Sequence, residues 1–245
     1  MEKIEKIRFG EQFPELSYYE KRDWHLNEMR LVEFFPEKYY EVTLISTNDD
    51  INILKKHLSQ IDSPLPIAID LEWEDELCLF QFCYEQIALI IRHPKGEGNK
   101  YLFDFLKSHL FYGKGINHDL IKLYDKFHYD FKENIEDIAK TRLEPYGHSI
   151  NFIQMTHQFA GKPTAEFKDV RITKSNWDLP ELSMRQVLYA AFDVVAISVA
   201  YPNFPPAITM SQTKKKSKSN PKKRVSSIDC NNGQIKKPQK LIKEK

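Results

Sequence analysis

Three apolar, β-rich runs follow one another almost without a break in this chain, and no other feature constrains its fold as much. They are PIAIDLEW (66–73), LCLFQFCY (77–84) and QIALIIRH (86–93). Parallel neighbours need a connection of a dozen or more residues, whereas antiparallel neighbours need only a tight turn. The short links therefore predict an antiparallel meander of three strands.

Helix and strand patterns alternate on both sides of this meander. YYEVTLIS (39–46) is predicted as a strand, and 48–58 as a helix with Asn48 as its N-cap. This order predicts an α/β fold with a ribonuclease H-like mixed β-sheet, an antiparallel meander plus parallel strands, flanked by helices. After the meander we expect a helix within YLFDFLKSHL, a short run ending at Gly115, a helix over 118–127, a strand over 134–137, and helices over 138–144, 149–160 and 184–201.

Charge is distributed unevenly along the 245 residues. Residues 211–245 hold 12 Lys and Arg against two acidic residues, which leaves 24 basic and 33 acidic side chains in the remainder. The basic stretch has almost no apolar residues, which is typical of a segment without a packed core. We therefore predict an N-terminal extension (1–38), a domain (39–208) and a basic, disordered tail (209–245).

Other signals favour a reducing, intracellular compartment. No run of about 18 apolar residues is found, so no membrane partner is expected, and the N-terminus lacks the apolar stretch of a secretory signal. Cys78, Cys83 and Cys230 have the spacing of neither a disulfide framework nor a zinc site. The stretch KKKSKSNPKKR (214–224) is typical of nuclear localisation or nucleic-acid binding, with a solubilising tail as the alternative. A nuclear location is expected.

Asp70 and Glu72 are two residues apart in IAIDLEW, so they point to the same face of the predicted strand. Ile67, Ile69 and Leu71 point the other way, into the core. Two carboxylates this close repel each other unless a cation binds between them. An acidic strand face exposed to solvent is the alternative, and the pair alone does not decide between the two.

Tyr189 and Asp193 are four residues apart and share one face of the last predicted helix. Ser183 before that helix and Gln186 three positions later form a capping-box pattern. Nearly all other residues of 187–201 are apolar or aromatic, which predicts a buried helix. A buried aspartate needs a partner, either a metal ion or a nearby Arg or backbone amide.

Asp119 follows the motif GKGIN, in which Gly113 and Gly115 let the backbone turn tightly into a helix. It falls in the first turn of that helix, where a carboxylate interacts favourably with the helix dipole. This favourable position is enough to explain Asp119 on its own. Asp119 indicates a catalytic site only when it is considered together with the other acids.

Together the acids stand in a characteristic order: Asp-x-Glu on a strand, Asp119 on a middle helix, and Tyr-x-x-x-Asp on the last helix. The order resembles the DEDDy branch of the DnaQ-like (ribonuclease H-like) 3′→5′ exonucleases, with the greatest likeness to the exonuclease domain of the Werner syndrome helicase and to ribonuclease D. DLEW (70–73) is similar to the first motif of that family, and GKGINHD to the second. SNW (175–177) and YAAFDVVA resemble the third, and the likeness extends over about residues 39–205.

The resemblance implies hydrolysis at nucleic-acid 3′ ends by a two-metal mechanism that releases nucleoside monophosphates. Asp70, Glu72 and Asp193 would ligate one Mg²⁺ or Mn²⁺, and Asp70 would bridge to a second ion held by Asp119. Tyr189 would orient the attacking water. Oxygen-only ligands suit these two metals rather than zinc.

Two neighbouring residues are candidates for contact with nucleic acid. Trp73 follows the acid pair and can stack on a terminal base, with an ordinary core tryptophan as the alternative. Lys174 precedes the last helix and can meet a phosphate, with a solvated loop as the default. The phosphate chemistry does not distinguish DNA from RNA. The rival function is a catalytically inactive, nuclease-like scaffold that binds nucleic acid or a protein partner.

Overall fold

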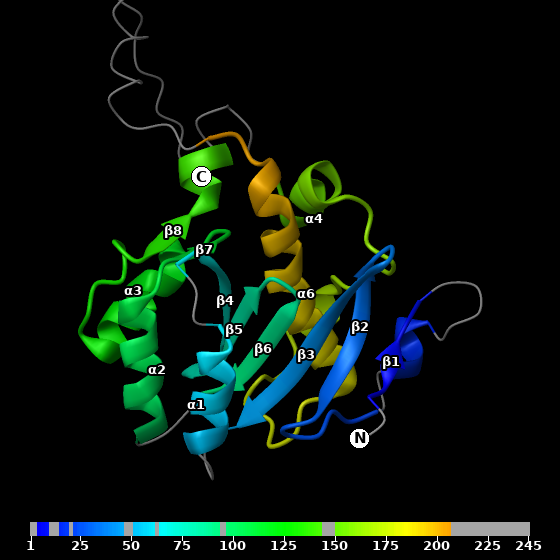
Figure 1. Cartoon of the computed structure of the whole chain (residues 1–245), viewed down its shortest axis with the longest axis horizontal. Helices are drawn as coiled ribbons and strands as arrows, with labels where there is room; N and C mark the ends of the chain where they lie inside the picture. The colour runs from blue at the N-terminus through cyan, green and yellow to red at the C-terminus, as the bar shows by residue number, and fades with distance from the viewer. Residues whose placement is uncertain are drawn as a thin grey trace, which may run out of the picture. The chain divides into compact units, whose positions relative to one another are not determined.

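A computed structural model describes residues 4–9, 15–19, 22–46, 51–61, 64–93, 97–143 and 150–206 (Figure 1). The predicted basic tail, with Cys230, and the predicted N-cap Asn48 lie outside the described residues.

The three apolar runs form the centre of the sheet. They are β4 (Ile67–Trp73), β5 (Leu77–Tyr84) and β6 (Ile87–Arg92), and each pairs antiparallel with the next. The predicted meander is therefore confirmed. It lies within an eight-stranded sheet of order β1-β2-β3-β6-β5-β4-β7-β8.

Parallel strands extend the meander on both sides, which confirms the mixed sheet. β3 (Lys38–Ser46) pairs parallel with β6. On the other side β7 (Phe111–Gly113) pairs parallel with β4, and β8 (Ile135–Asp137) pairs parallel with β7. Each parallel pairing follows a connection long enough to cross back over the sheet.

The segment predicted as an N-terminal extension supplies two more strands. β2 (Met29–Phe35) pairs antiparallel with β3, and β1 (Lys6–Ile7) pairs parallel with β2. Glu37, with φ of 64°, lies in the turn that joins β2 to β3. The predicted boundary at residue 38 thus falls inside a β-hairpin of the sheet.

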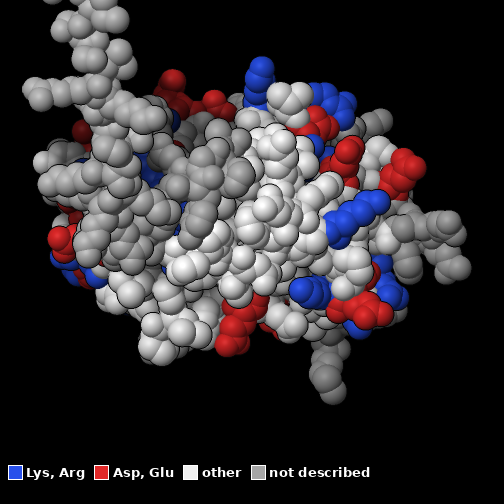
Figure 2. Space-filling model, turned by 90° about the horizontal axis from the view of Figure 1, so that it is seen from above, with Lys and Arg blue, Asp and Glu red and all other residues white. Residues whose placement is uncertain are grey.

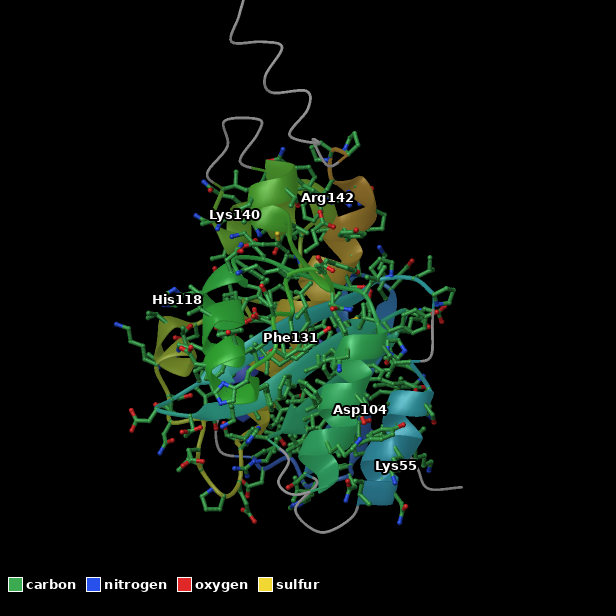
Figure 3. All side chains as sticks on the ribbon, turned by 90° about the vertical axis from the view of Figure 1, so that its left-hand side faces the viewer. Lys55, Asp104, His118, Phe131, Lys140 and Arg142 are labelled. Atoms are coloured by element: carbon green, nitrogen blue, oxygen red, sulfur yellow. The ribbon has the colours of Figure 1, made fainter. Side chains whose placement is uncertain are left out.

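Helices cover the two faces of the sheet. α1 (Ile51–Ser59), α2 (Glu97–Ser108) and α3 (Asn117–Phe127) lie side by side on one face, and Figure 3 shows that face toward the viewer. α6 (Met184–Ala200) packs across β4, β5 and β6 on the other face (Figure 1). The sheet is therefore the middle layer between two hydrophobic cores.

The alternation of β4 decides which side chains meet which helices. Ile67, Ile69 and Leu71 belong to the core beneath α1, α2 and α3, as predicted, whereas Ala68 belongs to the core beneath α6. Side chains two apart in a strand share a face. Asp70 and Glu72 therefore project to the α6 side.

Helix α6 is the most completely buried helix among the described residues. Its capping box is confirmed: the Ser183 hydroxyl oxygen accepts from the Gln186 amide at 3.3 Å, and the Gln186 side chain accepts from the Ser183 amide at 3.0 Å. The window Met184–Asn203 has the length and mean hydropathy (1.2) of a membrane-crossing helix, although Arg185 and Asp193 interrupt its apolar residues. In the fold, 83% of that window is buried inside the protein.

The segment between β8 and α6 is less regular than predicted. One π-helical turn (Ala139–Leu143) replaces the helix expected over 138–144. The helix expected over 149–160 divides into α4 (Phe152–Met155) and a π-helical turn (Thr156–Ala160). A short helix, α5 (Val170–Thr173), was not predicted, although its N-cap Asp169 accepts from the Arg171 amide at 2.8 Å.

Candidate active site

Strand β4 places Asp70 and Glu72 side by side, half-buried, beneath α6. The Asp70 carboxylate accepts from the Leu71 amide at 2.9 Å, and Glu72 accepts from the Gln81 side-chain amide at 3.3 Å. Gln81 lies directly opposite Asp70 on β5 and is fully buried. The register of the β4–β5 pair shifts between Glu72 and Trp73, so regular pairing ends just after the acids.

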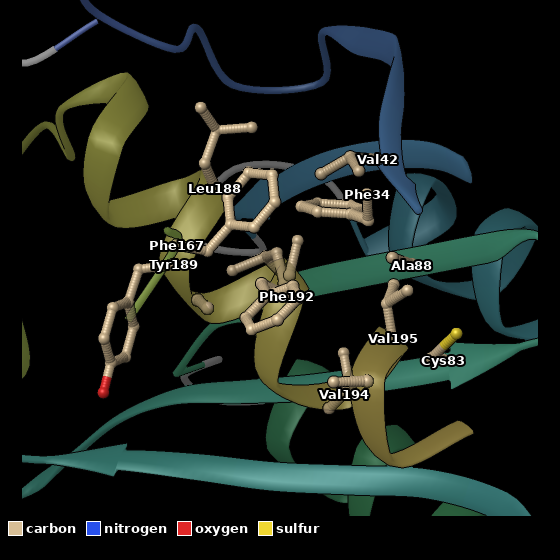
Figure 4. Packing of buried hydrophobic residues seen from close by; sticks show 14 of the residues in the cluster. Phe34, Val42, Cys83, Ala88, Phe167, Leu188, Tyr189, Phe192, Val194 and Val195 are labelled. Carbon is tan, nitrogen blue, oxygen red and sulfur yellow. The ribbon is translucent and has the colours of Figure 1, made fainter. Parts of the chain in front are cut away.

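Helix α6 supplies Tyr189 and Asp193, each only 2% exposed. In Figure 4 the Tyr189 hydroxyl points away from the apolar side chains of the core around Phe192. That hydroxyl lies 2.7 Å from the Thr173 hydroxyl and accepts from the Lys168 ammonium group. The polar end of Tyr189 is therefore held by two residues outside its own helix.

Lys168 contributes a positive charge to this group of acids. Its Nζ lies 2.7 Å from both carboxylate oxygens of Asp193. The same nitrogen lies 4.7 Å from the centre of the Phe152 ring and 3.9 Å from that of Tyr189, within the range of cation–π attraction. The α6 carboxylate and phenol are thus joined through one ammonium group.

The carboxylates lie close enough to perturb one another. Burial, together with the charges of Asp70 and Asp193, raises the pKa of Glu72 to about 9. Burial also raises the pKa of Asp70, and the Asp193 charge raises it further. For Asp193 itself, burial raises the pKa while Lys168 opposes the change. Such mutual repulsion favours any cation that can bind among the three groups.

Asp119 approaches this group from α3. A Cβ atom on Gly113 would lie 2.7 Å from the Ile69 carbonyl oxygen, so only glycine permits β7 to lie this close to β4. Gly115, with φ of 75°, then turns the chain into α3, whose first turn carries Asp119. Burial raises the pKa of Asp119, and its charge in turn raises that of Asp70.

Asp137, at the end of β8, holds the start of α3 in place by accepting hydrogen bonds. It accepts hydrogen bonds from the backbone amides of Gly115 at 2.9 Å, Ala139 at 3.0 Å and Asn117 at 3.3 Å, and from the Asn117 side chain. The same carboxylate also ties β8 to the turn that positions Asp119.

The predicted catalytic residues therefore lie near one another, but they do not form a complete set of ligands around one metal position. Asp70, Glu72 and Asp193 interact electrostatically, and Tyr189 joins Asp193 through Lys168. Among the residues that the structure describes, no three Asp, Glu, His or Cys side chains lie close enough to hold one ion. The donor set still fits a divalent cation, because it offers carboxylate oxygens and one of its members, Asp193, already binds the ammonium cation of Lys168.

The two predicted nucleic-acid contacts differ in their surroundings. Trp73 is partly buried against the core beneath α3, with the Lys122 Nζ 4.8 Å from its ring centre. Lys174 is exposed at the end of α5. Figure 2 shows a face on which basic and acidic side chains are interspersed beside an uncharged area. Both contacts stay predictions.

Three residues near the acids were not identified from the sequence. From the sequence, Lys168 has the same two alternatives as Lys174, a phosphate contact or a solvated loop, and no pattern predicts a role for Thr173 or Gln81. The segment around Lys168 has no apolar periodicity that reveals an inward side chain. Gln81 lies in the middle of an otherwise apolar strand, and an amide in such a position was the available signal.

Comparison with known families decides the classification of this fold and site. Residues 42–206 match the family model described as a 3′-5′ exonuclease domain. The chain belongs to this exonuclease family. The predicted family and its ribonuclease H-like fold are thereby confirmed, and the match extends from β3 to the end of α6.

Solved structures of exonucleases share the fold. The catalytic core of RRP6 from Trypanosoma brucei has a TM-score of 0.54 at 20% identity, covering 66% of this chain and 46% of that one. Escherichia coli RNase D has a TM-score of 0.53 at 20% identity, with 67% and 44% covered. The Nibbler EXO domain of Aedes aegypti has a TM-score of 0.50 at 18% identity, with 65% and 85% covered.

The chain spans less than half of the RRP6 and RNase D chains, and at these identities the likeness concerns the fold alone. A search of curated proteins finds no match.

Proposed function

We propose that this exonuclease domain removes nucleotides one at a time from nucleic-acid 3′ ends by cation-dependent hydrolysis, releasing nucleoside monophosphates. One observation carries the proposal. β4 and α6 bring Asp70, Glu72 and Asp193 together under burial, which raises the pKa of all three, and the Asp193 charge raises those of Asp70 and Glu72 further. A fold gains no stability from such an arrangement, whereas a cation-binding reaction centre requires it.

Mg²⁺ or Mn²⁺ would be held by Asp70, Glu72, Asp119 and Asp193. Two such ions, when bound, supply stabilisation of the charge that develops on the attacking and leaving oxygens at phosphorus. The protein contributes fixed donors for this purpose, because β4 and α6 are anchored in the cores on either side of the sheet.

Tyr189 would orient the attacking water through its hydroxyl. Burial raises the pKa of Tyr189, and the Asp193 charge adds to the rise, so the phenol is neutral near pH 7. A neutral phenol orients a water by hydrogen bonding instead of accepting its proton outright. Its hydrogen bonds to Lys168 and Thr173 fix the hydroxyl for this role.

RNA is the first substrate to test. Escherichia coli RNase D is described as an exoribonuclease involved in structured RNA processing, and a Trypanosoma brucei RNase D is known in complex with RNA U12. A DNA 3′ end offers the same phosphate chemistry and belongs in the same experiment. The basic stretch 214–224 supports a nuclear location, which is part of this proposal.

A time course on 5′-labelled substrates tests the proposal. Single-stranded RNA, single-stranded DNA and 3′-recessed DNA would be incubated with the full chain and Mg²⁺ or Mn²⁺, beside the double variant Asp70→Ala/Glu72→Ala. The proposal predicts a ladder that shortens from the 3′ end and is absent in the variant and with EDTA. Intact substrate in every lane would refute it.

A second candidate is a non-cutting scaffold that binds nucleic acid or a protein partner. It is favoured by the Lys168–Asp193 ion pair, since in the described residues no three ligands are close enough for one ion. The scaffold predicts retained substrate binding in a mobility-shift assay without any shortening, equal in wild type and in the double variant.

A further inference from the structure

The ammonium group of Lys168 takes up both oxygens of the α6 aspartate. Nζ lies 2.7 Å from each Asp193 oxygen and also donates to the Tyr189 hydroxyl. The Asp193 side chain is 3% exposed and that of Lys168 is 22% exposed, so bulk water screens the pair only weakly. The oxygens through which Asp193 would bind a divalent cation are therefore already occupied.

The same positive charge acts on the strand acids. Its presence lowers the pKa of Asp70 and of Glu72, in opposition to their burial and mutual repulsion. One ammonium group thus contacts Asp193 and acts electrostatically on Asp70 and Glu72, with the sign of charge of a bound cation. Because Nζ lies 2.7 Å from both Asp193 oxygens, a divalent ion that binds on this side of the carboxylate has to displace Lys168.

The surroundings of Lys168 allow its side chain to leave. Residues 161–169 form no helix or strand, and the lysine side chain is flexible along its four-carbon stem. The Phe152 ring lies 4.7 Å from Nζ and is itself only partly buried. This ring already attracts the ammonium beside Asp193, and the contact can persist when Nζ moves off the carboxylate.

We propose that Lys168 is an internal competitor for the cation site. In the metal-free protein its ammonium group holds Asp193 and Tyr189 in place, and it releases Asp193 when a divalent cation binds. The inference rests on the proposed function, because it takes Asp193 to be a cation ligand. It goes further in assigning to one residue the control of how tightly the cation is held.

Removal of the competitor is expected to tighten cation binding. Isothermal titration of the metal-free full chain with Mn²⁺ would compare wild type with Lys168→Met, which keeps the length of the side chain without its charge. The matched control is Lys162→Met, an exposed lysine in the same segment. We expect the Kd of Lys168→Met to fall about tenfold or more, since both Asp193 oxygens become free, and that of Lys162→Met to stay within about twofold of wild type. An unchanged or weaker affinity in Lys168→Met would overturn the inference.

Failure of this inference is distinguishable from failure of the proposed function. If wild type, Lys168→Met and Lys162→Met all bind no Mn²⁺, the cation site itself is refuted. If wild type binds Mn²⁺ and Lys168→Met binds it equally well, only the competition is refuted.

A second measurement uses the wild-type chain and so does not depend on the folding of a variant. Lysine acylation with acetic anhydride, read by mass spectrometry, would follow the reactivity of Lys168 with and without Mn²⁺. Release from Asp193 predicts a several-fold faster modification of Lys168 in Mn²⁺, while Lys162 reacts at the same rate in both. Equal reactivity of Lys168 under both conditions would contradict the proposed release.

Discussion

Asp137 and Asp193 are both buried aspartates, yet their partners differ in kind. Asp137, 6% exposed, accepts from three backbone amides that belong to the turn into α3 and to the start of the following π-helical turn. Asp193, 2% exposed, is bound by the ammonium group at the end of the flexible Lys168 side chain. Backbone donors can leave only if the fold opens, whereas an ammonium can leave by rotation of one side chain.

The difference separates a structural carboxylate from an exchangeable one. No counter-ion is needed to stabilise the buried Asp137 carboxylate, because backbone amides donate hydrogen bonds to it. Asp193 lies beside Asp70 and Glu72, and the rise in pKa of these acids records an arrangement that costs stability. Such a cost is typical of sites selected for function.

The largest expected difference between the two aspartates is in catalysis. Asp193→Asn should lower the rate of 3′-end hydrolysis by about a thousandfold, because it removes a charged cation ligand from the reaction centre. Asp137→Asn should retain most of the activity when assayed well below its melting temperature. Initial rates on 5′-labelled RNA or DNA at saturating Mn²⁺ measure both, and comparable losses would remove the distinction.

Stability should show the reverse order. Asp137→Ala leaves the amides of Gly115, Asn117 and Ala139 without their acceptor, and each buried unpaired donor costs about 1–3 kcal/mol. We expect a loss of about 3 kcal/mol in the free energy of unfolding once partial rehydration is included. Urea unfolding measures it. A loss below that of Asp193→Asn would show that the backbone donors of Asp137 contribute little.

Substitution of Tyr189 tests whether a side chain bound to Lys168 contributes to catalysis even though it is not a carboxylate. Tyr189→Phe removes the hydroxyl held by Lys168 and Thr173 and should lower kcat by about tenfold to a hundredfold. Thr173→Val keeps the phenol but removes one of its partners, so a smaller loss is expected. Single-turnover rates separate the two, and a larger effect from Thr173→Val would assign the main role to the threonine.

The smallest effect concerns Glu136, a second structural carboxylate next to Asp137 on β8. The Arg142 guanidinium, 2.8 Å away, and the Thr141 hydroxyl lower its pKa against the opposing effect of burial. A lowered pKa in the folded state gives stability that is present above the ordinary value of 4.5 and is lost as pH falls further.

Glu136→Gln should therefore cost about 1 kcal/mol near pH 7, where the charged hydrogen bonds are intact, and almost nothing in strong acid. Melting temperatures of wild type and variant across pH 2–8 measure the gap. Parallel curves with no convergence at low pH would contradict the charged role of Glu136.

Patterns in the sequence predicted most of the strands and helices that hold the candidate active site. The alternation of IAIDLEW placed Asp70 and Glu72 on one face, and the apolar helix around Asp193 predicted its burial, because both patterns follow from local periodicity. The short links of the meander predicted the strand pairing, because links this short can join only antiparallel neighbours. These features depend on residues close together in the chain.

Lys168 was not predictable in this way. It lies 25 residues before Asp193 in an irregular segment, and only the packing of that segment on α6 brings the ammonium to the carboxylate. The two strands contributed by residues 4–35 were missed because their pattern is short and mixed with charged residues. The unpredicted parts are those in which tertiary contacts, not periodicity, decide the structure.

Thermal unfolding with and without Mn²⁺ tests the central claim most directly, on wild type, Asp193→Asn and Asp137→Asn. A ligand that binds only the folded state raises the melting temperature, and the rise grows with the logarithm of the ligand concentration divided by its Kd. The account predicts a rise of the melting temperature in Mn²⁺ for wild type and Asp137→Asn, from a lower starting value in the latter, and no rise for Asp193→Asn. An undiminished rise in Asp193→Asn, or no rise in wild type, would show that the α6 aspartate is not part of a cation site.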